Sequence, residues 1–141
     1  MISNYNNNIN ITSVYKKITE NQIKDYAQAS GDFNPIHLNR KFAATTQFGR
    51  IIAHGMLTLA FVNEMLSRSF GKNWLMNGKL RVRFKGAAYP GDVVCSSGRF
   101  VKEKIHAGKR IVSCAISLTN HRGQELITGM ATVTLPMDEE E

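Results

Sequence analysis

Hydrophobic and polar residues alternate through the second half of the chain. Hydrophobic positions alternate with cationic ones from Leu80 to Lys85, and the same period of two recurs in three longer segments separated by the turn sequences HAGK and NHRG. The longer segments are about 92–104, 109–119 and 124–135. This alternation is typical of half-exposed strands, and such short connections join antiparallel hairpins. With a further strand near Val14 to Ile18, the pattern predicts one antiparallel sheet of about five strands.

A helical period replaces this alternation from Gly55 to about Phe70. One stripe follows i, i+3 and i+4 spacing, and the adjoining faces are hydrophobic as well. The stripe consists of Met56, Leu59, Ala60, Asn63, Leu66 and Phe70, and the adjoining faces carry Leu57, Phe61, Val62 and Met65. A helix that is apolar nearly all round is expected in the centre of its domain. Asn63 is then predicted to be a buried polar group, which needs a hydrogen-bond partner.

A shorter helix is predicted upstream of the long one. Thr19 and Gln22 fit a capping box, so we expect a helix over about 20–29 that stops at Gly31. The next residues, 32–35, read as a turn, because the proline at their end holds the preceding residue extended.

Together these elements predict the α+β class, with a single antiparallel sheet wrapped around one long central helix. We expect this domain to span residues 14–136, after a flexible lead-in over 1–13 and before an acidic tail over 137–141. A curled sheet of this kind leaves an edge strand open. Pairing of that edge with a second copy predicts a homodimer.

Composition places the chain among ordinary globular domains. Its 141 residues are 43% hydrophobic and 21% charged, which is enough for one core without disulfides or metals. The N-terminal sequence MISNYNNNINIT lacks the basic and hydrophobic regions of a secretory signal. The most apolar segment is interrupted by His54, Asn63, Glu64 and Arg68, which argues against a membrane span. We therefore expect a cytoplasmic protein with no membrane partner.

The chain is strongly basic, with a net charge of +7, and four of its eleven acidic residues lie in the tail over 138–141. A basic body favours an anionic partner: a nucleic acid, a phosphate-bearing small molecule or an acidic carrier protein. We expect no nucleic acid, because aromatic residues do not punctuate a basic stretch and no recognition motif is present. Cys95 and Cys114 lie within hydrophobic alternation and are expected to be buried thiols.

Two short motifs carry candidate chemistry. In SGDFNPIH, the carboxylate of Asp32 lies five positions before the imidazole of His37. Two such groups suit general acid–base chemistry if they converge on one water or one substrate proton. In IIAHGM, Gly55 begins the long helix, where unpaired N–H groups and a partial positive charge are available. A glycine there admits a ligand close to the backbone and would suit an oxygen that gains negative charge, such as a thioester carbonyl.

Plainer interpretations stay open on the spacing alone. An Asp before Asn-Pro is often only a turn residue, and a His beside a hydrophobic segment is often structural. A metal site formed by Asp32, His37 and His54 is a third possibility. No HxH or HExxH spacing supports it, so we expect no metal and no other cofactor.

The two motifs together resemble those of the MaoC-like dehydratases, whose best-known members are the (R)-specific enoyl-CoA hydratases of hot-dog fold. SGDFNPIH and FGRIIAHGM carry the resemblance, and YPGDVV and GMATVTLP further along also look like the family. The resemblance implies a hot-dog domain that dimerises, with Asp32 and His37 as the catalytic pair. It implies that the N–H of Gly55 polarises the thioester carbonyl, and Asn63 falls where relatives carry a polar helix residue near the acyl thioester.

The implied activity is that of a hydro-lyase, which hydrates trans-2-enoyl-CoA reversibly to (R)-3-hydroxyacyl-CoA. A (3R)-hydroxyacyl-[acyl carrier protein] dehydratase of fatty-acid synthesis stays open as the alternative. So do an acyl-CoA thioesterase, with Glu64 as its carboxylate, and a non-catalytic acyl-CoA binder. Cationic side chains are expected to steer the phosphates of coenzyme A or an acidic carrier. They are Arg81, Arg83, Lys85, Lys102, Lys104, Lys109 and Arg110.

Overall fold

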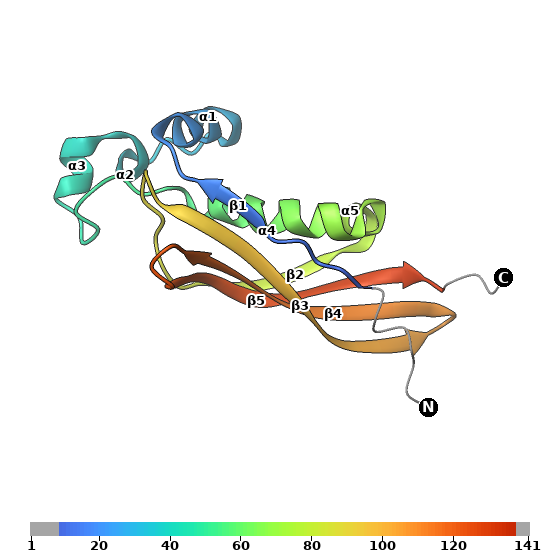
Figure 1. The fold of residues 1–141 in the computed structure, drawn as a ribbon. Helices are drawn as coiled ribbons and strands as arrows, with labels where there is room; N and C mark the ends of the chain where they lie inside the picture. The colour runs from blue at the N-terminus through green and yellow to red at the C-terminus, as the bar shows by residue number, and fades with distance from the viewer. Residues whose placement is uncertain (1–8, 138–141) are drawn as a thin grey trace.

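A five-stranded antiparallel sheet carries one long helix across one face in the computed structural model, which describes residues 9–137 (Figure 1). The elements in chain order are β1 (Val14–Lys17), α1 (Glu20–Ser30), α2 (Pro35–Leu38), α3 (Arg40–Ala44), α4 (Gly55–Phe70), α5 (Lys72–Asn77), β2 (Lys79–Phe84), β3 (Val93–His106), β4 (Lys109–Asn120) and β5 (Glu125–Pro136). The strand order is β1-β3-β4-β5-β2, so β1 and β2 form the edges. The α+β prediction is confirmed. The three short helices α1, α2 and α3 gather at one end, and the β3–β4 hairpin extends past α5 at the other.

The predicted hairpins and caps are present. The β3–β4 connection is a two-residue turn between His106 and Lys109, in which Ala107 has φ 52° and Gly108 has φ 74°. Positive φ at both central positions matches the right-handed twist of the flanking strands. At α1, Thr19 and Gln22 form the predicted capping box, and Gly31 ends the helix in the left-handed region at φ 78°.

The long helix α4 has the predicted bounds, but the prediction that it is buried all round is wrong for the single chain. Leu57, Phe61 and Val62 are buried, whereas Met56 and Asn63 are exposed. The reason is that α4 lies on one face of an open sheet, so that only its sheet-facing side is covered. Asn63 is therefore not the buried polar group that the pattern predicts.

The short helix α5 was not predicted. Its Trp74 is 6% exposed, and the indole Nε1–H donates to Oδ1 of Asn63 over 2.7 Å. The side chain of Asn77 accepts from the backbone N–H of Thr134 on β5 over 2.8 Å. These bonds tie α5 to α4 and to the sheet.

The predictions of buried cysteines and of an exposed Arg110 have different outcomes. Cys114 is buried as expected, and burial raises the pKa of its thiol to about 11, whereas Cys95 is only half-buried. Arg110 is not an exposed steering cation, because it is 4% exposed and its Nη2 lies 2.7 Å from Oε2 of Glu103 across the β3–β4 pair. A buried guanidinium needs such a partner, and the alternating pattern could not reveal it.

The predicted ends of the domain stay predictions. Ile9 and Ile11, which fall in the predicted lead-in, pack against the hydrophobic core. Residues 1–8 and most of the acidic tail lie outside the described residues. Within residues 9–137, no helix combines the length and hydrophobicity that crossing a bilayer requires.

Candidate active site

The segment that holds Asp32 and His37 is a capped turn leading into a helix. Oδ1 of Asp32 accepts from the N–H of Asn34 over 3.2 Å, and Oδ1 of Asn34 accepts from the N–H of Ile36 over 3.1 Å. Pro35 occupies the first position of α2, where a missing N–H is harmless. The predicted turn therefore ends one residue early, and His37 projects from a helical turn rather than from an irregular loop.

The imidazole of His37 has one defined tautomer in its neutral form. Its Nδ1 lies 2.8 Å from the carbonyl oxygen of Ile52, which can only accept, so Nδ1 carries the hydrogen. The basic lone pair is consequently on Nε2. Burial lowers the pKa of His37, and the neighbouring His54 lowers it further, against the opposing influence of the Ile52 bond and of Asp32. A neutral ring at neutral pH is what a general base requires.

Three titratable groups converge here. One ring nitrogen each of His37 and His54 and a carboxylate oxygen of Asp32 all lie within 4.8 Å of one another. Asp32 is exposed, His37 is half-buried and His54 is 2% exposed. The turn thus brings the predicted pair together, on top of a buried histidine from the second motif.

The same three residues are the possible metal site of the sequence analysis, and their geometry does not favour a metal ion. The two imidazole rings are stacked, with centroids 3.9 Å apart and planes inclined by 27°. Ring lone pairs lie in the ring planes, so stacked rings direct them side by side rather than toward one ion at about 2.0–2.1 Å. One nitrogen of His54 is also occupied by a backbone carbonyl, as Nε2 lies 3.0 Å from the oxygen of Asp32.

Gly55 is the first residue of α4 and follows His54 directly. The N–H of a first helical residue has no acceptor within the helix, so it is available to a ligand. A Cβ at this position would come 3.3 Å from Cε1 of Phe84, at the end of β2. Glycine therefore serves two purposes here: close packing of the Phe84 ring and open access to a backbone donor.

Asn63 lies apart from these groups. It follows Gly55 by eight residues on α4, which corresponds to about 12 Å along a helix axis. Its Oδ1 already accepts from the indole of Trp74. The structure thus brings Asp32, His37 and Gly55 into one neighbourhood, and places Asn63 two turns further along the helix.

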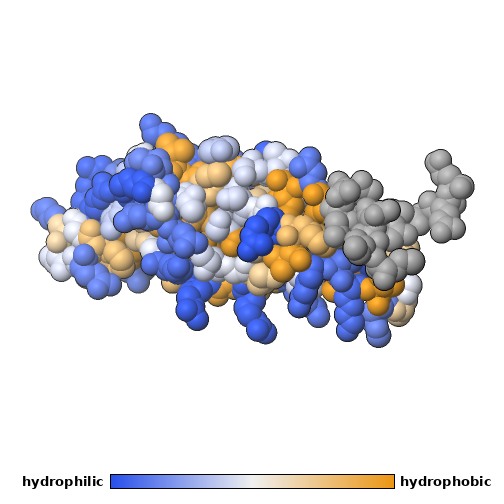
Figure 2. All heavy atoms as spheres, turned by 60° about the horizontal axis from the view of Figure 1, so that its bottom comes forward, coloured by the Kyte–Doolittle hydropathy of each residue, from blue (hydrophilic) through white to orange (hydrophobic). Residues whose placement is uncertain are grey.

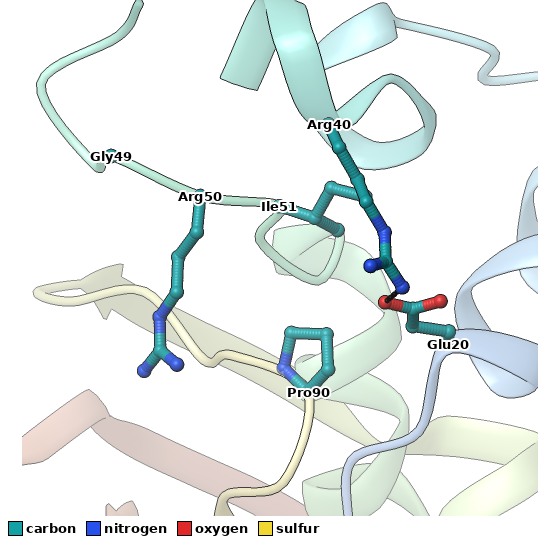
Figure 3. A pocket seen from close by; sticks show the side chains of 6 residues that line it. All are labelled: Glu20, Arg40, Gly49, Arg50, Ile51 and Pro90. Atoms are coloured by element: carbon teal, nitrogen blue, oxygen red, sulfur yellow. Dashed lines mark hydrogen bonds and ion pairs between the residues drawn. The ribbon is translucent and has the colours of Figure 1, made fainter. Parts of the chain in front are cut away.

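A pocket of about 360 Å³ lies beside the turn (Figure 3). It is lined by Glu20, Arg40, Gly49, Arg50, Ile51 and Pro90. A second pocket, which contains His37, shares Glu20, Arg40 and Ile51 with the first. The two pockets adjoin at these three residues, and together they make a depression with His37 in one part and Arg50 in the other. In Figure 3, Arg40 points to Glu20, with which it forms an ion pair, whereas Arg50 extends beside Pro90.

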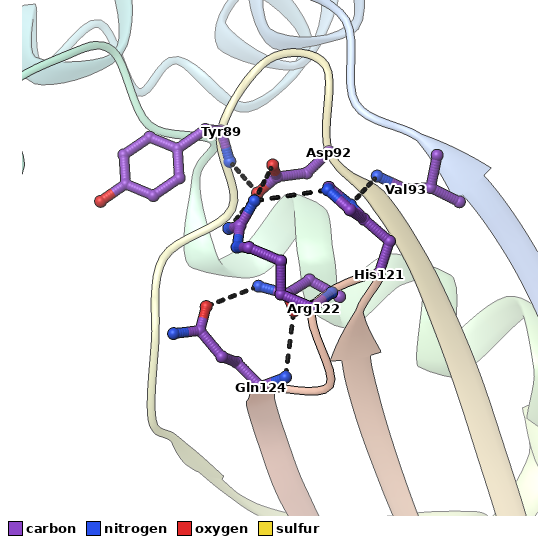
Figure 4. A network of polar contacts seen from close by, with 7 residues as sticks. Tyr89, Asp92, Val93, His121, Arg122 and Gln124 are labelled. Carbon is purple, nitrogen blue, oxygen red and sulfur yellow. Dashed lines mark hydrogen bonds and ion pairs between the residues drawn. The ribbon is translucent and has the colours of Figure 1, made fainter.

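A polar network holds the turn that contains Pro90, one of the residues lining this depression (Figure 4). Asp92 is 3% exposed, and its Oδ2 accepts from the N–H of Tyr89 over 3.0 Å. Oδ1 of Asp92 lies 3.2 Å from Nη1 of Arg122, and His121 accepts from the N–H of Val93 over 3.2 Å. The YPGD turn is thereby fixed against the β4–β5 connection, and with it the position of the Tyr89 ring beneath Arg50.

Comparison with known proteins places this arrangement in a family. The family described as "MaoC like domain" matches residues 7–121, most of the chain. The chain belongs to the MaoC-like domain family. Two relatives of the MaoC-like domain are the (R)-specific enoyl-CoA hydratase of Aeromonas caviae and the 3-hydroxybutyryl-CoA dehydratase of Methylorubrum extorquens. The first is 32% identical over 86% of this chain and 89% of its own length, and the second is 31% identical over 94% and 83%.

Solved structures confirm the hot-dog fold of this MaoC-like domain. The (R)-hydratase from A. caviae involved in PHA biosynthesis superposes with a TM-score of 0.76 at 29% identity, covering 89% of this chain and 93% of that one. The expected family and fold are thus both confirmed. The roles of Asp32, His37, Gly55 and Asn63 stay proposals, which rest on the geometry described above.

Sequence reasoning missed the packing around His54 and the depression beside Arg50. From the sequence alone, His54 is considered only as a possible metal ligand. A histidine that directly precedes a buried helix was the available signal, but its contacts with Asp32 and His37 span 22 and 17 positions along the chain. Such contacts have no local pattern in a single sequence.

Proposed function

We propose that the protein is a hydro-lyase that adds water to trans-2-enoyl-CoA and gives (R)-3-hydroxyacyl-CoA, with dehydration as the reverse reaction. The observation that carries this proposal is the tautomer of His37: Nδ1 is engaged by Ile52, so Nε2 is left as the basic nitrogen of a ring that has a nitrogen within 4.8 Å of a carboxylate oxygen of Asp32. The family relationship supports the same reaction class, since the relatives named above are a hydratase and a dehydratase.

The reaction needs only proton transfers and one carbon–oxygen bond. Asp32 and His37 together take a proton from water, and the water oxygen bonds to C3 of the enoyl thioester. The π electrons of the C2–C3 bond form a C1–C2 double bond as the carbonyl π pair moves to the thioester oxygen, where the N–H of Gly55 stabilises the enolate. Asp32 and His37 then return one proton to C2. A backbone donor of this kind contributes about two to three orders of magnitude in rate, and the acid–base pair contributes about two to four.

We propose that the active form is a homodimer located in the cytoplasm. In the single chain the candidate site is open, and large hydrophobic side chains next to it are exposed: Phe33 by 59%, Met56 by 57% and Phe84 by 48%. Phe84 ends β2, an edge strand. A second copy packed along β2 would cover this exposed hydrophobic surface. Figure 2 shows hydrophobic side chains among the hydrophilic ones on one face of the molecule. Light scattering on the purified protein tests the homodimer, and a monomer at micromolar concentration would contradict it.

Two other activities have weaker support. A thioesterase would use Glu64, but its carboxylate lies 3.2 Å from Nζ of Lys16 and 3.1 Å from Nη2 of Arg68. A carboxylate held by two cations is poorly placed to attack a thioester. A dehydratase acting on carrier-bound chains would use the same pair as the proposed hydratase and differs only in the group attached to sulfur.

The test is an absorbance assay of crotonyl-CoA and longer trans-2-enoyl-CoA substrates, with chiral analysis of the product. We expect loss of enoyl absorbance without release of free thiol and an (R)-3-hydroxyacyl product. Thiol release at constant enoyl absorbance would identify a thioesterase instead. Turnover of carrier-bound substrate with none of the CoA thioester would identify the carrier-protein dehydratase.

A further inference from the structure

His54 is a buried histidine that the reaction described above does not use. It is 2% exposed, and its Nδ1 is a buried nitrogen without a hydrogen-bond partner among the described residues. Its other nitrogen, Nε2, lies 3.0 Å from the backbone carbonyl oxygen of Asp32. Because a carbonyl can only accept, Nε2 carries the hydrogen, and the neutral ring has its lone pair on the partnerless Nδ1. A buried acceptor with no partner is unfavourable for folding and calls for an explanation.

The ring of His54 is enclosed by two other rings and one turn. The imidazole of His37, from α2, is stacked on it at a centroid distance of 3.9 Å. The phenol ring of Tyr26, from α1, lies on it in a tilted arrangement at 4.8 Å and 58°. The Asp32 turn contributes a carbonyl to Nε2 and a carboxylate within 4.8 Å of a ring nitrogen. Tyr26, His37 and Asp32 are thus the titratable groups that face His54 from the elements packed against it.

We propose that His54 is a positioning residue for the reaction, which fixes Asp32 and His37 relative to the start of α4. This inference rests on the proposed function. His54 holds Asp32 by a hydrogen bond to its backbone and supports His37 by a flat face. Since His54 is followed by Gly55, the same residue links the acid–base pair to the backbone donor for the thioester oxygen. His54 is thus in contact with Asp32 and His37 and directly precedes Gly55, so one buried residue positions all three groups.

The choice of histidine has a chemical reason. A phenyl ring would supply the flat face but no donor for the Asp32 carbonyl, and a glutamine would supply a donor but no flat face. Histidine supplies both, and repulsion between the two adjacent imidazoles adds to the effect of burial in lowering the pKa of His37. The partnerless nitrogen is the consequence of using a ring with two nitrogens where only one can be bonded.

The experiment compares His54→Phe and His54→Gln with wild type and with His106→Gln, a matched control in the β3–β4 hairpin. We expect each His54 variant to lower kcat by about tenfold to a hundredfold, because small misplacements of reacting groups have effects of this size, while KM changes little. In His54→Gln, removal of the second imidazole should also raise the pKa of His37. The acid limb of kcat/KM against pH then moves to higher pH. The same shift in His54→Phe, which keeps a ring over His37, would show that it does not come from loss of burial.

A measurement without substrate keeps the inference testable if a variant is inactive. NMR titration of the ring protons of His37 in folded His54→Gln should give a higher pKa than in wild type. Wild-type kcat together with an unshifted His37 titration would overturn the inference. Asp32→Asn and His37→Gln are assayed alongside: wild-type rates in those two would refute the proposed function, whereas their inactivity with unaffected His54 variants would refute this inference alone.

Discussion

The guanidinium of Arg50 lies over the ring of Tyr89, with Cζ 4.0 Å from the ring centroid. Stacking on an aromatic face orients the guanidinium without a carboxylate partner and leaves its charge available to an anion. Arg50 also lines the depression that begins at His37. We therefore expect an acyl-CoA whose thioester binds at His37 to extend its phosphate groups toward Arg50.

Arg50→Ala should raise KM for enoyl-CoA by about threefold to tenfold, as expected for loss of one exposed charge-assisted contact. The short N-acetylcysteamine thioester carries no phosphate, so its kcat/KM should be unchanged. Steady-state kinetics with both substrates provides the check. Arg99→Ala, which removes an exposed arginine of β3, is the matched control. Equal losses for both substrates would show that Arg50 acts on the fold rather than on phosphate.

Replacement of the proposed catalytic pair should abolish turnover and leave the fold intact. We expect Asp32→Asn and His37→Gln to lower kcat for crotonyl-CoA at least about a hundredfold. Neither residue contributes to the buried core, so circular dichroism spectra and melting temperatures should stay close to wild type. Asp25→Asn, on the exposed side of α1, controls for loss of a surface carboxylate. Activity within a few-fold of wild type in both variants would exclude the mechanism.

The pH dependence should follow the depressed pKa of His37. In the proposed mechanism the neutral ring is the base, so kcat/KM should stay high as the pH falls below about 6.5, the usual value, and should decline only nearer the lower folded-state value. The stability change has a defined sign as well. In the window between the two pKa values only the unfolded chain binds the proton, so the free energy of unfolding falls as the pH is lowered through this window. His37→Gln should remove this part of the pH dependence in urea titrations, and an unchanged slope would contradict the assignment.

Gly55→Ala should impair the reaction by two separable effects. The new methyl group would crowd the N–H donor, and its Cβ would lie 3.3 Å from the ring of Phe84, so the ring must shift. We expect kcat/KM to fall by about a hundredfold and the melting temperature to drop. Adding Phe84→Leu relieves the contact with the ring. The double variant should recover stability without recovering activity; recovery of both would show that Gly55 matters only for packing.

Asp92→Ala tests the network behind the YPGD turn. It removes the acceptor of the Tyr89 N–H and the ionic partner of Arg122. We expect the free energy of unfolding to fall by about 1–3 kcal/mol, which thermal denaturation detects as a shift of about 2–4 °C per kcal/mol. Arg122→Ala should be milder, because this side chain is 43% exposed and water replaces its contact. If Asp92→Ala melts like wild type, the network does not stabilise the fold.

The sequence predicts the helices and strands of this protein better than it predicts which side chains are exposed. Alternation between Leu80 and Lys85 and in the later segments identifies β2 to β5, because one face of each strand meets the core. The bounds of α4 were predicted as well, from its glycine start and helical period. The sequence does not predict which side of α4 is buried, because an almost uniformly apolar helix carries no strong directional signal. Arg110 was misread for a related reason: its partner Glu103 lies on the neighbouring strand.

For the site, the sequence identifies groups but not their contacts. Spacing and turn chemistry bring Asp32 near His37 and place Gly55 at a helix start. The tautomer of His37 depends on the carbonyl of Ile52, and the support of its ring depends on His54. Both contacts come from a loop whose path is decided by the whole fold, so no property of residues 30–37 contains them.

The capped turn around Pro35 affects the activation entropy of the proposed reaction. Pro35 fixes one backbone angle, and the side chains of Asp32 and Asn34 bond to the backbone N–H groups two residues on. The conformational freedom of this segment is therefore lost during folding rather than during each reaction. The activation entropy of hydration then reflects mainly the capture of water and substrate. Warming should accelerate the reaction without loosening its geometry until the turn itself begins to melt.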